Sequence, residues 1–173
     1  MKITRLNYIL SDGQEVSFED WTHESKLGIK WVCNGETHIF DLGYVSGIEP
    51  TPCMDGFVVV YPDFHSVTEV FKPPHNAAIY NADGSLRLRL KTPKPLARHL
   101  PGYVHSPDEV ARLEPEGIWQ VGWNTNDFGE ICTWEAPYVM WAHIGLHRDV
   151  YERRYFDPNT GEFDMTHSHV ARR

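Results

Sequence analysis

The most restrictive feature of this sequence is a run between residues 76 and 91 in which apolar and basic side chains alternate. Leucines take every second position and basic residues take the positions between them: Leu86, Arg87, Leu88, Arg89, Leu90 and Lys91. This period of two is typical of a β-strand with one face in a core and the other in water. Residues 77–80 can form a partner strand, and Asp83-Gly84 lies in the connecting turn, where glycine adopts positive φ without strain. The run predicts an antiparallel hairpin at the centre of a mostly antiparallel sheet.

Turn sequences of the same kind recur along the chain. Asp12-Gly13 and Asn34-Gly35 each separate two segments of strand character, and residues 157–161 form a further turn that contains Pro158 and Gly161. The apolar run from 57 to 61 is typical of a strand that is buried on both faces. Residues 43–56 are rich in turn formers and include Pro50 and Pro52, so we expect no regular structure there.

One short helix is predicted after residue 105. Ser106 can cap its N-terminus, Pro107 suits the first helical position, and Glu109 completes a capping box with Ser106. A second helical turn near residues 17–26 is an alternative to a loop. These elements predict a mainly β fold, a β-rich α+β protein. We expect antiparallel hairpins that form a sandwich or a partly open barrel, with one or two short helices.

The length of 173 residues suits a single domain, 1–173. Residues 93–105, with three prolines, are a possible crossing segment, and the polar residues 166–173 are expected to be a loose C-terminal tail. The three cysteines are widely spaced, which favours reduced thiols. We find neither an apolar leader nor a run long enough to span a membrane. We therefore expect a cytoplasmic protein that does not contact a membrane.

The net charge of −8 is unevenly distributed. Residues 1–50 carry four Lys or Arg against eight Asp or Glu, and residues 105–173 carry six against twelve, whereas residues 51–104 carry six against four. An acidic chain repels phosphate backbones, which argues against direct binding to nucleic acid. It attracts a basic protein partner, although a merely solvated surface would explain the charge as well.

The sequence offers no catalytic or metal-binding motif. His143 and His147 are four residues apart, but no glutamate follows His143, and in a strand the pair would be too far apart to share one ion. No nucleophile elbow or phosphate-binding loop is present. Carboxylate pairs such as Asp127 with Glu130, or Glu135 with Glu152, have no local support. We expect no cofactor and no metal, and whether the chain is an enzyme stays open, with the balance against it.

Tryptophans and tyrosines are concentrated between residues 119 and 156. Aromatic residues dominate β cores, but some of these could anchor an interface, as Trp and Tyr often do. Acidic residues that could accompany such a surface occur early in the chain and around the predicted helix; Asp108 and Glu109 already have a role in capping. The predicted partner-binding residues are Glu15, Glu19, Asp20, Glu24, Glu114, Glu116 and Trp119.

The phrase Asn-Ala-Ala-Ile-Tyr-Asn-Ala-Asp-Gly-Ser-Leu-Arg, residues 76–87, is similar to hairpins of bacterial immunity proteins of the contact-dependent growth inhibition type. The resemblance covers this segment alone. It implies a protein that binds and neutralises a cognate toxin domain, such as a nuclease. We expect a monomer or a homodimer. Nucleases tend to be basic, so an acidic inhibitor could cover the surface that binds the phosphate backbone. The alternative interpretation is a small-ligand-binding β-barrel or enzyme with its pocket at the barrel mouth. A third interpretation is an accessory module whose aromatic patch forms a homodimer.

Overall fold

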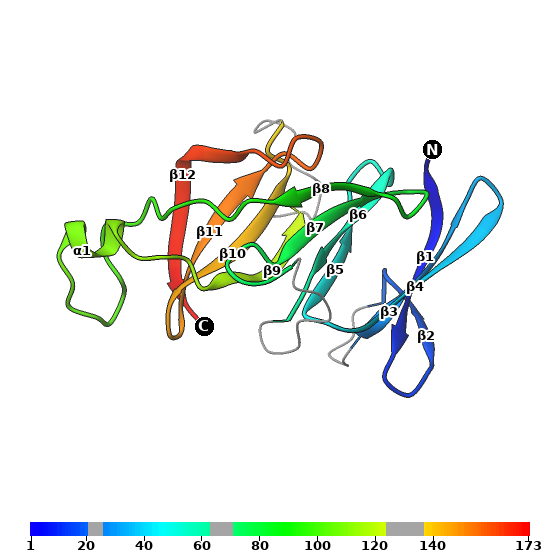
Figure 1. Ribbon diagram of the computed structural model, residues 1–173, viewed down its shortest axis with the longest axis horizontal. Helices are drawn as coiled ribbons and strands as arrows, with labels where there is room; N and C mark the ends of the chain where they lie inside the picture. Colours follow the sequence, from blue (N-terminus) through cyan, green and yellow to red (C-terminus); the bar gives the residue numbers. More distant parts are fainter. Residues whose placement is uncertain (21–25, 63–70, 124–136) are drawn as a thin grey trace.

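The computed structural model describes residues 1–20, 26–62, 71–123 and 137–173. Within these ranges the protein consists of three four-stranded antiparallel sheets and one short helix, so the expectation of a mainly β fold is confirmed. The sheets are stacked and none of them closes into a barrel (Figure 1). No helix in these ranges is both long enough and apolar enough to cross a membrane.

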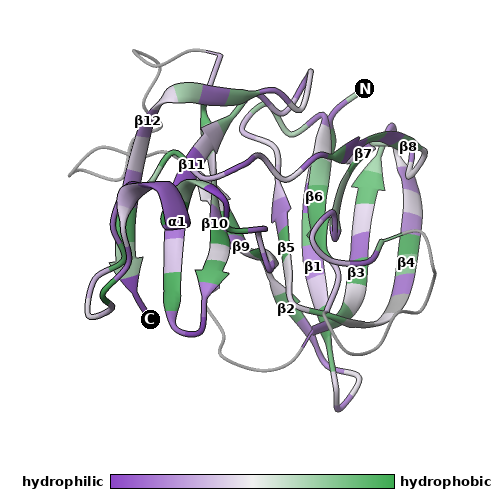
Figure 2. Cartoon of the chain, turned by 60° about the vertical axis from the view of Figure 1, so that its left-hand side comes forward, coloured by the Kyte–Doolittle hydropathy of each residue, from purple (hydrophilic) through white to green (hydrophobic). Residues whose placement is uncertain are grey.

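The N-terminal sheet has the strand order β2-β1-β3-β4. Its strands are β1 (Ile3–Leu10), β2 (Glu15–Ser17), β3 (Lys26–Cys33) and β4 (Glu36–Val45). The predicted turn between β3 and β4 is present, with Asn34 and Gly35 both at positive φ. Figure 2 shows polar and apolar bands succeeding one another along β3 and β4. Of β3, the side chains of Ile29, Trp31 and Cys33 are buried, as their alternation predicts.

The central sheet has the order β5-β6-β7-β8. Its strands are β5 (Gly47–Pro50), β6 (Gly56–Val60), β7 (Ala77–Asn81) and β8 (Leu86–Leu90). Every residue of β6 is buried, which confirms a strand enclosed on both faces. Phe57 and Val59 pack into a core shared with the N-terminal sheet, whereas Val58 and Val60 pack into a core shared with the C-terminal sheet. The central sheet is therefore the middle of three layers.

The predicted hairpin is formed by β7 and β8, but β8 is an edge strand and its burial differs from the expected alternation. Leu86 is 45% exposed and only Leu90 of the three leucines is fully buried. A register shift at Ile79 and Tyr80 accompanies this change. Arg87 turns partly inward, where its guanidinium donates hydrogen bonds to Asn81 and to the carbonyl of Asp55.

Two expectations were wrong. Residues 43–56 were expected to lack regular structure, yet they contain the end of β4 and all of β5. β5 is an edge strand, which tolerates the proline at its last position. Residues 166–173 were expected to be loose, yet residues 166–172 belong to β12, which pairs with β11. The backbone pairing holds this polar segment without burying its side chains.

The C-terminal sheet has the order β12-β11-β10-β9. Its strands are β9 (Gly117–Trp123), β10 (Met140–His147), β11 (Val150–Phe156) and β12 (Phe163–Arg172). The helix α1 (Pro107–Ala111) precedes β9 and has the predicted capping box between Ser106 and Glu109. Of the segment 17–26, for which a helical turn and a loop were the alternatives, residues 21–25 lie outside the described residues.

The segment 93–105 forms neither strand nor helix and crosses the C-terminal sheet. A fully buried pair of charged side chains, Glu152 and Arg154, holds it there. Glu152 accepts hydrogen bonds from the backbone N–H groups of Leu96 and Ala97, and Arg154 donates to the carbonyl of Lys94 at 3.1 Å. The carboxylate and guanidinium approach each other to 3.5 Å. The crossing segment is thus fixed by buried polar contacts.

Candidate protein-binding face

The outward surface of the C-terminal sheet carries aromatic rings and arginines. Along β11 the residues at even positions are buried, whereas Tyr151, Arg153 and Tyr155 are only half-buried and point away from the core. The neighbouring strands add indole, imidazole and guanidinium groups to this surface. We call it the aromatic–arginine face, and its members are Trp119, Trp141, His143, Tyr151, Arg153 and Arg173.

A β-bulge brings Trp119 onto this face. In the pairing of β10 with β9, His143 lies opposite Gln120, but the next residue, Ile144, lies opposite Ile118. Trp119 is therefore the additional, unpaired residue. As a result Trp119 and Gln120, although consecutive, are both accessible, whereas the residues on either side of them are buried. Re-aiming a side chain is a common role of bulges beside functional sites.

Two glycines allow the tryptophans to lie flat on the sheet. A Cβ atom on Gly145 would stand 2.2 Å from the indole of Trp119, and one on Gly122 would stand 2.3 Å from the indole of Trp141. Neither distance is compatible with a real side chain. The Trp141 ring is also tethered, because its N–H donates to the carbonyl of Trp123 at 2.7 Å.

His143 lies in the middle of the face, between two aromatic rings. Its imidazole stacks on Tyr151, with ring centroids 4.0 Å apart, and on Trp141, at 4.5 Å. The Nε–H of Arg153 donates to Nε2 of His143 at 3.0 Å. Burial, followed by the positive charges of Arg153 and Arg173, lowers the pKa of His143 to about 4. The ring is therefore neutral at physiological pH, and because Nε2 accepts, its proton is on Nδ1.

The arginines lie over the tryptophans. The guanidinium of Arg153 is 4.7 Å from the centroid of Trp141, and that of Arg173 is 5.6 Å from the centroid of Trp119. Both distances are typical of cation–π interactions. In the part of the chain that the structure describes, neither of these arginines forms an ion pair, whereas Arg172 is paired with Asp149 at 2.7 Å. On this face, the guanidinium groups of Arg153 and Arg173 thus have no Asp or Glu partner among the described residues.

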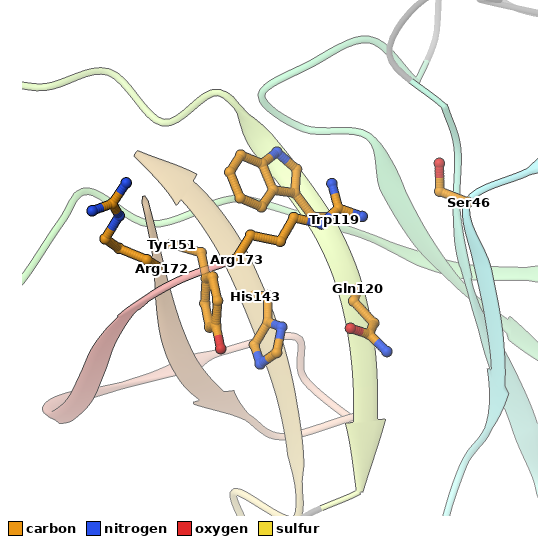
Figure 3. Close-up of a pocket in the computed structure, with 7 residues that line it drawn as sticks. All are labelled: Ser46, Trp119, Gln120, His143, Tyr151, Arg172 and Arg173. Carbon is orange, nitrogen blue, oxygen red and sulfur yellow. The ribbon is translucent and has the colours of Figure 1, made fainter. Parts of the chain in front are cut away.

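A hollow of about 490 Å³ opens at this face. Figure 3 shows His143 beside Tyr151 and the Arg173 side chain reaching towards Trp119. The hollow is lined by Ser46, Trp119, Gln120, His143, Tyr151, Arg172 and Arg173. No Asp or Glu is among these lining residues, and several of them offer N–H or O–H donors. The arrangement suits a ligand or protein segment that brings acceptors or negative charge.

Of the predicted partner-binding residues, Trp119 and Glu116 lie close together at this face. The backbone N–H of Glu116 donates to the carbonyl of Gly145, the residue beneath the Trp119 ring, at 2.8 Å. The Glu116 carboxylate accepts from the backbone N–H of Arg148. Glu114 is exposed but forms an ion pair with Lys94. Trp119, Glu116 and Glu114 therefore lie at the end of the molecule that is formed by the C-terminal sheet.

The remaining predicted residues lie elsewhere. Glu15 is in β2, where it pairs with Lys30 at 2.6 Å, and Glu19 and Asp20 follow that strand. Figure 1 shows β2 and the C-terminal sheet at opposite ends of the long axis. Glu24 lies outside the described residues. The structure therefore divides the predicted set between two distant surfaces.

Two of the groups considered for other chemistry, His143 and Glu152, have structural contacts. His143 is engaged with Arg153, and the described residues contain no group of three or more His, Cys, Asp or Glu that could hold a metal ion. Glu152 binds the crossing segment from a fully buried position. Asp127, Glu130 and Glu135 lie outside the described residues.

Sequence reasoning did not single out the arginines, Arg153 and Arg173, or the glycines, Gly122 and Gly145. One signal was available: in residues 151–156, Tyr-Glu-Arg-Arg-Tyr-Phe, the period of two assigns Tyr151, Arg153 and Tyr155 to one face. The position of Arg173 depends on the pairing of β12 with β11, which the polar composition of that segment did not indicate.

No protein-family model matches the sequence, and no curated protein is significantly similar to it. A solved structure, that of Tne2 in complex with Tni2, contains a chain that superposes on this one with a TM-score of 0.56 at 11% sequence identity. The match covers 99% of this chain and 99% of that chain. At this identity it shows a shared fold over almost the whole of both chains.

Proposed function

We propose that this chain is an immunity protein that binds a toxin protein and neutralises it. The observation that carries the proposal is the likeness to a chain from the Tne2–Tni2 complex, which extends over almost the whole length of both chains. A complex of two different proteins fits a toxin held by its immunity protein. The proposal also agrees with the resemblance of residues 76–87 to hairpins of immunity proteins.

Co-expression with the neighbouring gene tests the proposal. We expect the product of the adjacent upstream gene to be toxic when expressed alone and harmless when this chain is co-expressed. The two proteins are then expected to co-purify as a stoichiometric complex. A neighbour that is not toxic, or that does not bind the purified chain, would contradict the proposal.

We further propose that the toxin is basic, as the nuclease domain of a contact-dependent growth inhibition effector would be. The net charge of −8 supports this, because an acidic inhibitor is attracted to a basic domain. We propose that the toxin contacts the end of the molecule formed by the C-terminal sheet, where Glu116 lies beside Trp119. We also propose that the inhibitor acts in the cytoplasm, as a monomer or a homodimer. An interface of ordinary size covers about 800 Å² of each partner, too little to reach β2 as well.

Charge reversal tests the acidic contribution. Replacing Glu114 and Glu116 by Lys is expected to slow association with the toxin several-fold at low salt and to weaken its dependence on salt. Stopped-flow or surface-plasmon measurements at several salt concentrations give the rates. The matched control is the double change of Glu19 and Asp20 to Lys at the opposite end, which alters the net charge equally. Equal rates for both variants would remove Glu114 and Glu116 from the interface.

A further inference from the structure

The hollow on the aromatic–arginine face differs in charge from the rest of this acidic protein. Its lining contains two arginines and no Asp or Glu side chain. One of them, Arg172, is neutralised by Asp149, but the guanidinium of Arg173 forms no ion pair with any described residue. Arg153 is not a lining residue, but its Nε–H donates to the lining residue His143, and its two terminal nitrogens have no hydrogen-bond partner among the described residues. Two guanidinium groups are thus available to carboxylates.

The donors in the hollow are held in place before any partner arrives. His143 is fixed between Tyr151 and Trp141, and its Nδ1–H is available because Arg153 occupies Nε2. Trp119 is fixed against Gly145, and within the described residues its indole N–H has no acceptor. Rigid donors lose little entropy on binding, which favours a ligand rich in acceptors.

Aromatic rings with arginines could also bind single-stranded nucleic acid, whose bases stack on exposed ring faces. Here the ring faces are already engaged. Arg153 lies over Trp141, Arg173 lies over Trp119, and His143 stacks on Tyr151. The available groups are therefore the guanidinium edges and the N–H donors, which recognise carboxylates.

We propose that this hollow receives an acidic, protruding segment of the toxin, whose carboxylates bind Arg173 and Arg153 while its polar groups accept from the ring donors. The proposal rests on the proposed function and names the part of the partner that this face recognises. A hollow of about 490 Å³ is of the size of small-ligand pockets, so it suits a loop carrying Asp or Glu better than a flat surface. The basic part of the same partner then lies towards Glu116.

The test compares two double variants of the full chain with equal changes of charge. R153E/R173E reverses the face, and K2E/R5E reverses two exposed residues of the N-terminal sheet region. Binding to the inactivated product of the adjacent gene is measured by biolayer interferometry. We expect R153E/R173E to weaken the affinity at least about tenfold and K2E/R5E to change it little. Equal effects of the two variants would overturn the inference and leave the proposed function intact.

Circular dichroism checks that both variants fold. If R153E/R173E does not fold, the test is repeated with the single variant R173E, which changes an exposed residue. If the wild-type chain does not bind the neighbour's product, the proposed function fails, and a hexaglutamate peptide becomes the probe. We then expect the peptide to shift the indole N–H resonance of Trp119 in the wild type and not in R173E. An unchanged resonance would overturn the inference. Tight binding of a labelled single-stranded RNA, lost in R173E, would also overturn it.

Discussion

At the scale of single residues, two glycines, Gly122 and Gly145, shape the candidate site because they have no side chain. Trp119 and Trp141 lie against Gly145 and Gly122, where any Cβ atom would overlap an indole ring. Glycine in a strand interior weakens the strand, and an aromatic neighbour that covers the glycine recovers part of that loss. The glycines therefore have a packing role that a strand-propensity scale would count only as a defect.

Replacing Gly145 by Ala is expected to displace the Trp119 ring and to lower the free energy of unfolding by about 2 kcal/mol, because the added methyl group overpacks the site. Urea unfolding measures the loss, and the Trp fluorescence spectrum reports the ring. Gly47→Ala is the matched control, since its Cβ would lie 4.0 Å from the nearest atoms of Val60. Equal stability of the two variants would contradict this account.

His143 is expected to make stability depend on pH. Its pKa is lowered from 6.5 to about 4 in the folded protein. Between these values the unfolded chain binds a proton that the folded chain does not, so acidification favours unfolding. The contribution of His143 to the free energy of unfolding is fully present above pH 6.5 and is lost as the pH falls to about 4. Its size is on the order of 2 kcal/mol.

Glu49 acts in the opposite direction, because burial raises the pKa of its carboxyl to about 7. The contribution of Glu49 to the free energy of unfolding is fully present below its pKa in the unfolded chain, near 4.5, and is lost as the pH rises through 7. The effect of His143 is therefore measured as the difference between wild type and His143→Gln in urea unfolding at pH 7.5, 5.5 and 4.5. We expect the difference to shrink with acidification. A constant difference would show that His143 titrates normally.

At the scale of elements, the sequence predicted most strands and the helix, because turn chemistry and the period of two are local properties. The Asn34-Gly35 hairpin and the capping box at Ser106 needed no tertiary information. β5 and the part of β12 from residue 166 onward were not predicted, because their pairing depends on neighbouring strands rather than on local sequence. Proline is compatible with β5 because that strand is at an edge, and the polar side chains of β12 are compatible with pairing to β11 alone. Trp119 was predicted as a site residue, but its arginine neighbours depend on strand order.

The strand β11 carries two fully buried side chains of opposite charge, Glu152 and Arg154. Arg154→Leu is expected to lower the free energy of unfolding by about 3–5 kcal/mol, because the Glu152 charge would stay buried without its partner. The carbonyls of Lys94 and Asp164 would also lose a donor. Urea unfolding measures the change. Arg153→Leu, one residue earlier and facing outward, is the control and is expected to cost about 1 kcal/mol or less. Similar losses for the two variants would contradict the role given to the buried pair.

At the scale of the whole molecule, one sheet belongs to two cores. Alternate residues of β6 pack towards the N-terminal and the C-terminal sheets. Each outer sheet therefore buries its apolar face against the same middle layer, and loss of that layer would expose both. We expect the three layers to unfold together, as a single domain does.

Val58→Ala and Val59→Ala test this coupling from the two sides of β6, and each is expected to lower the free energy of unfolding by roughly 2 kcal/mol. Hydrogen exchange read by mass spectrometry is then expected to accelerate to the same degree in β3 and in β10, whichever valine is changed. Acceleration confined to the sheet that faces the substituted valine would show that the outer layers unfold independently.

The enclosure of β6 also bears on how such proteins diverge. Where a strand has no solvent-facing position, few residue types are acceptable, whereas the solvent-exposed positions on the outward faces of the two outer sheets are less constrained by packing. We therefore expect substitutions to be accepted more readily at exposed positions of the two outer sheets than in β6. A chain of the Tne2–Tni2 complex shares this fold along 99% of both lengths at 11% identity, so the fold is compatible with wide differences in sequence.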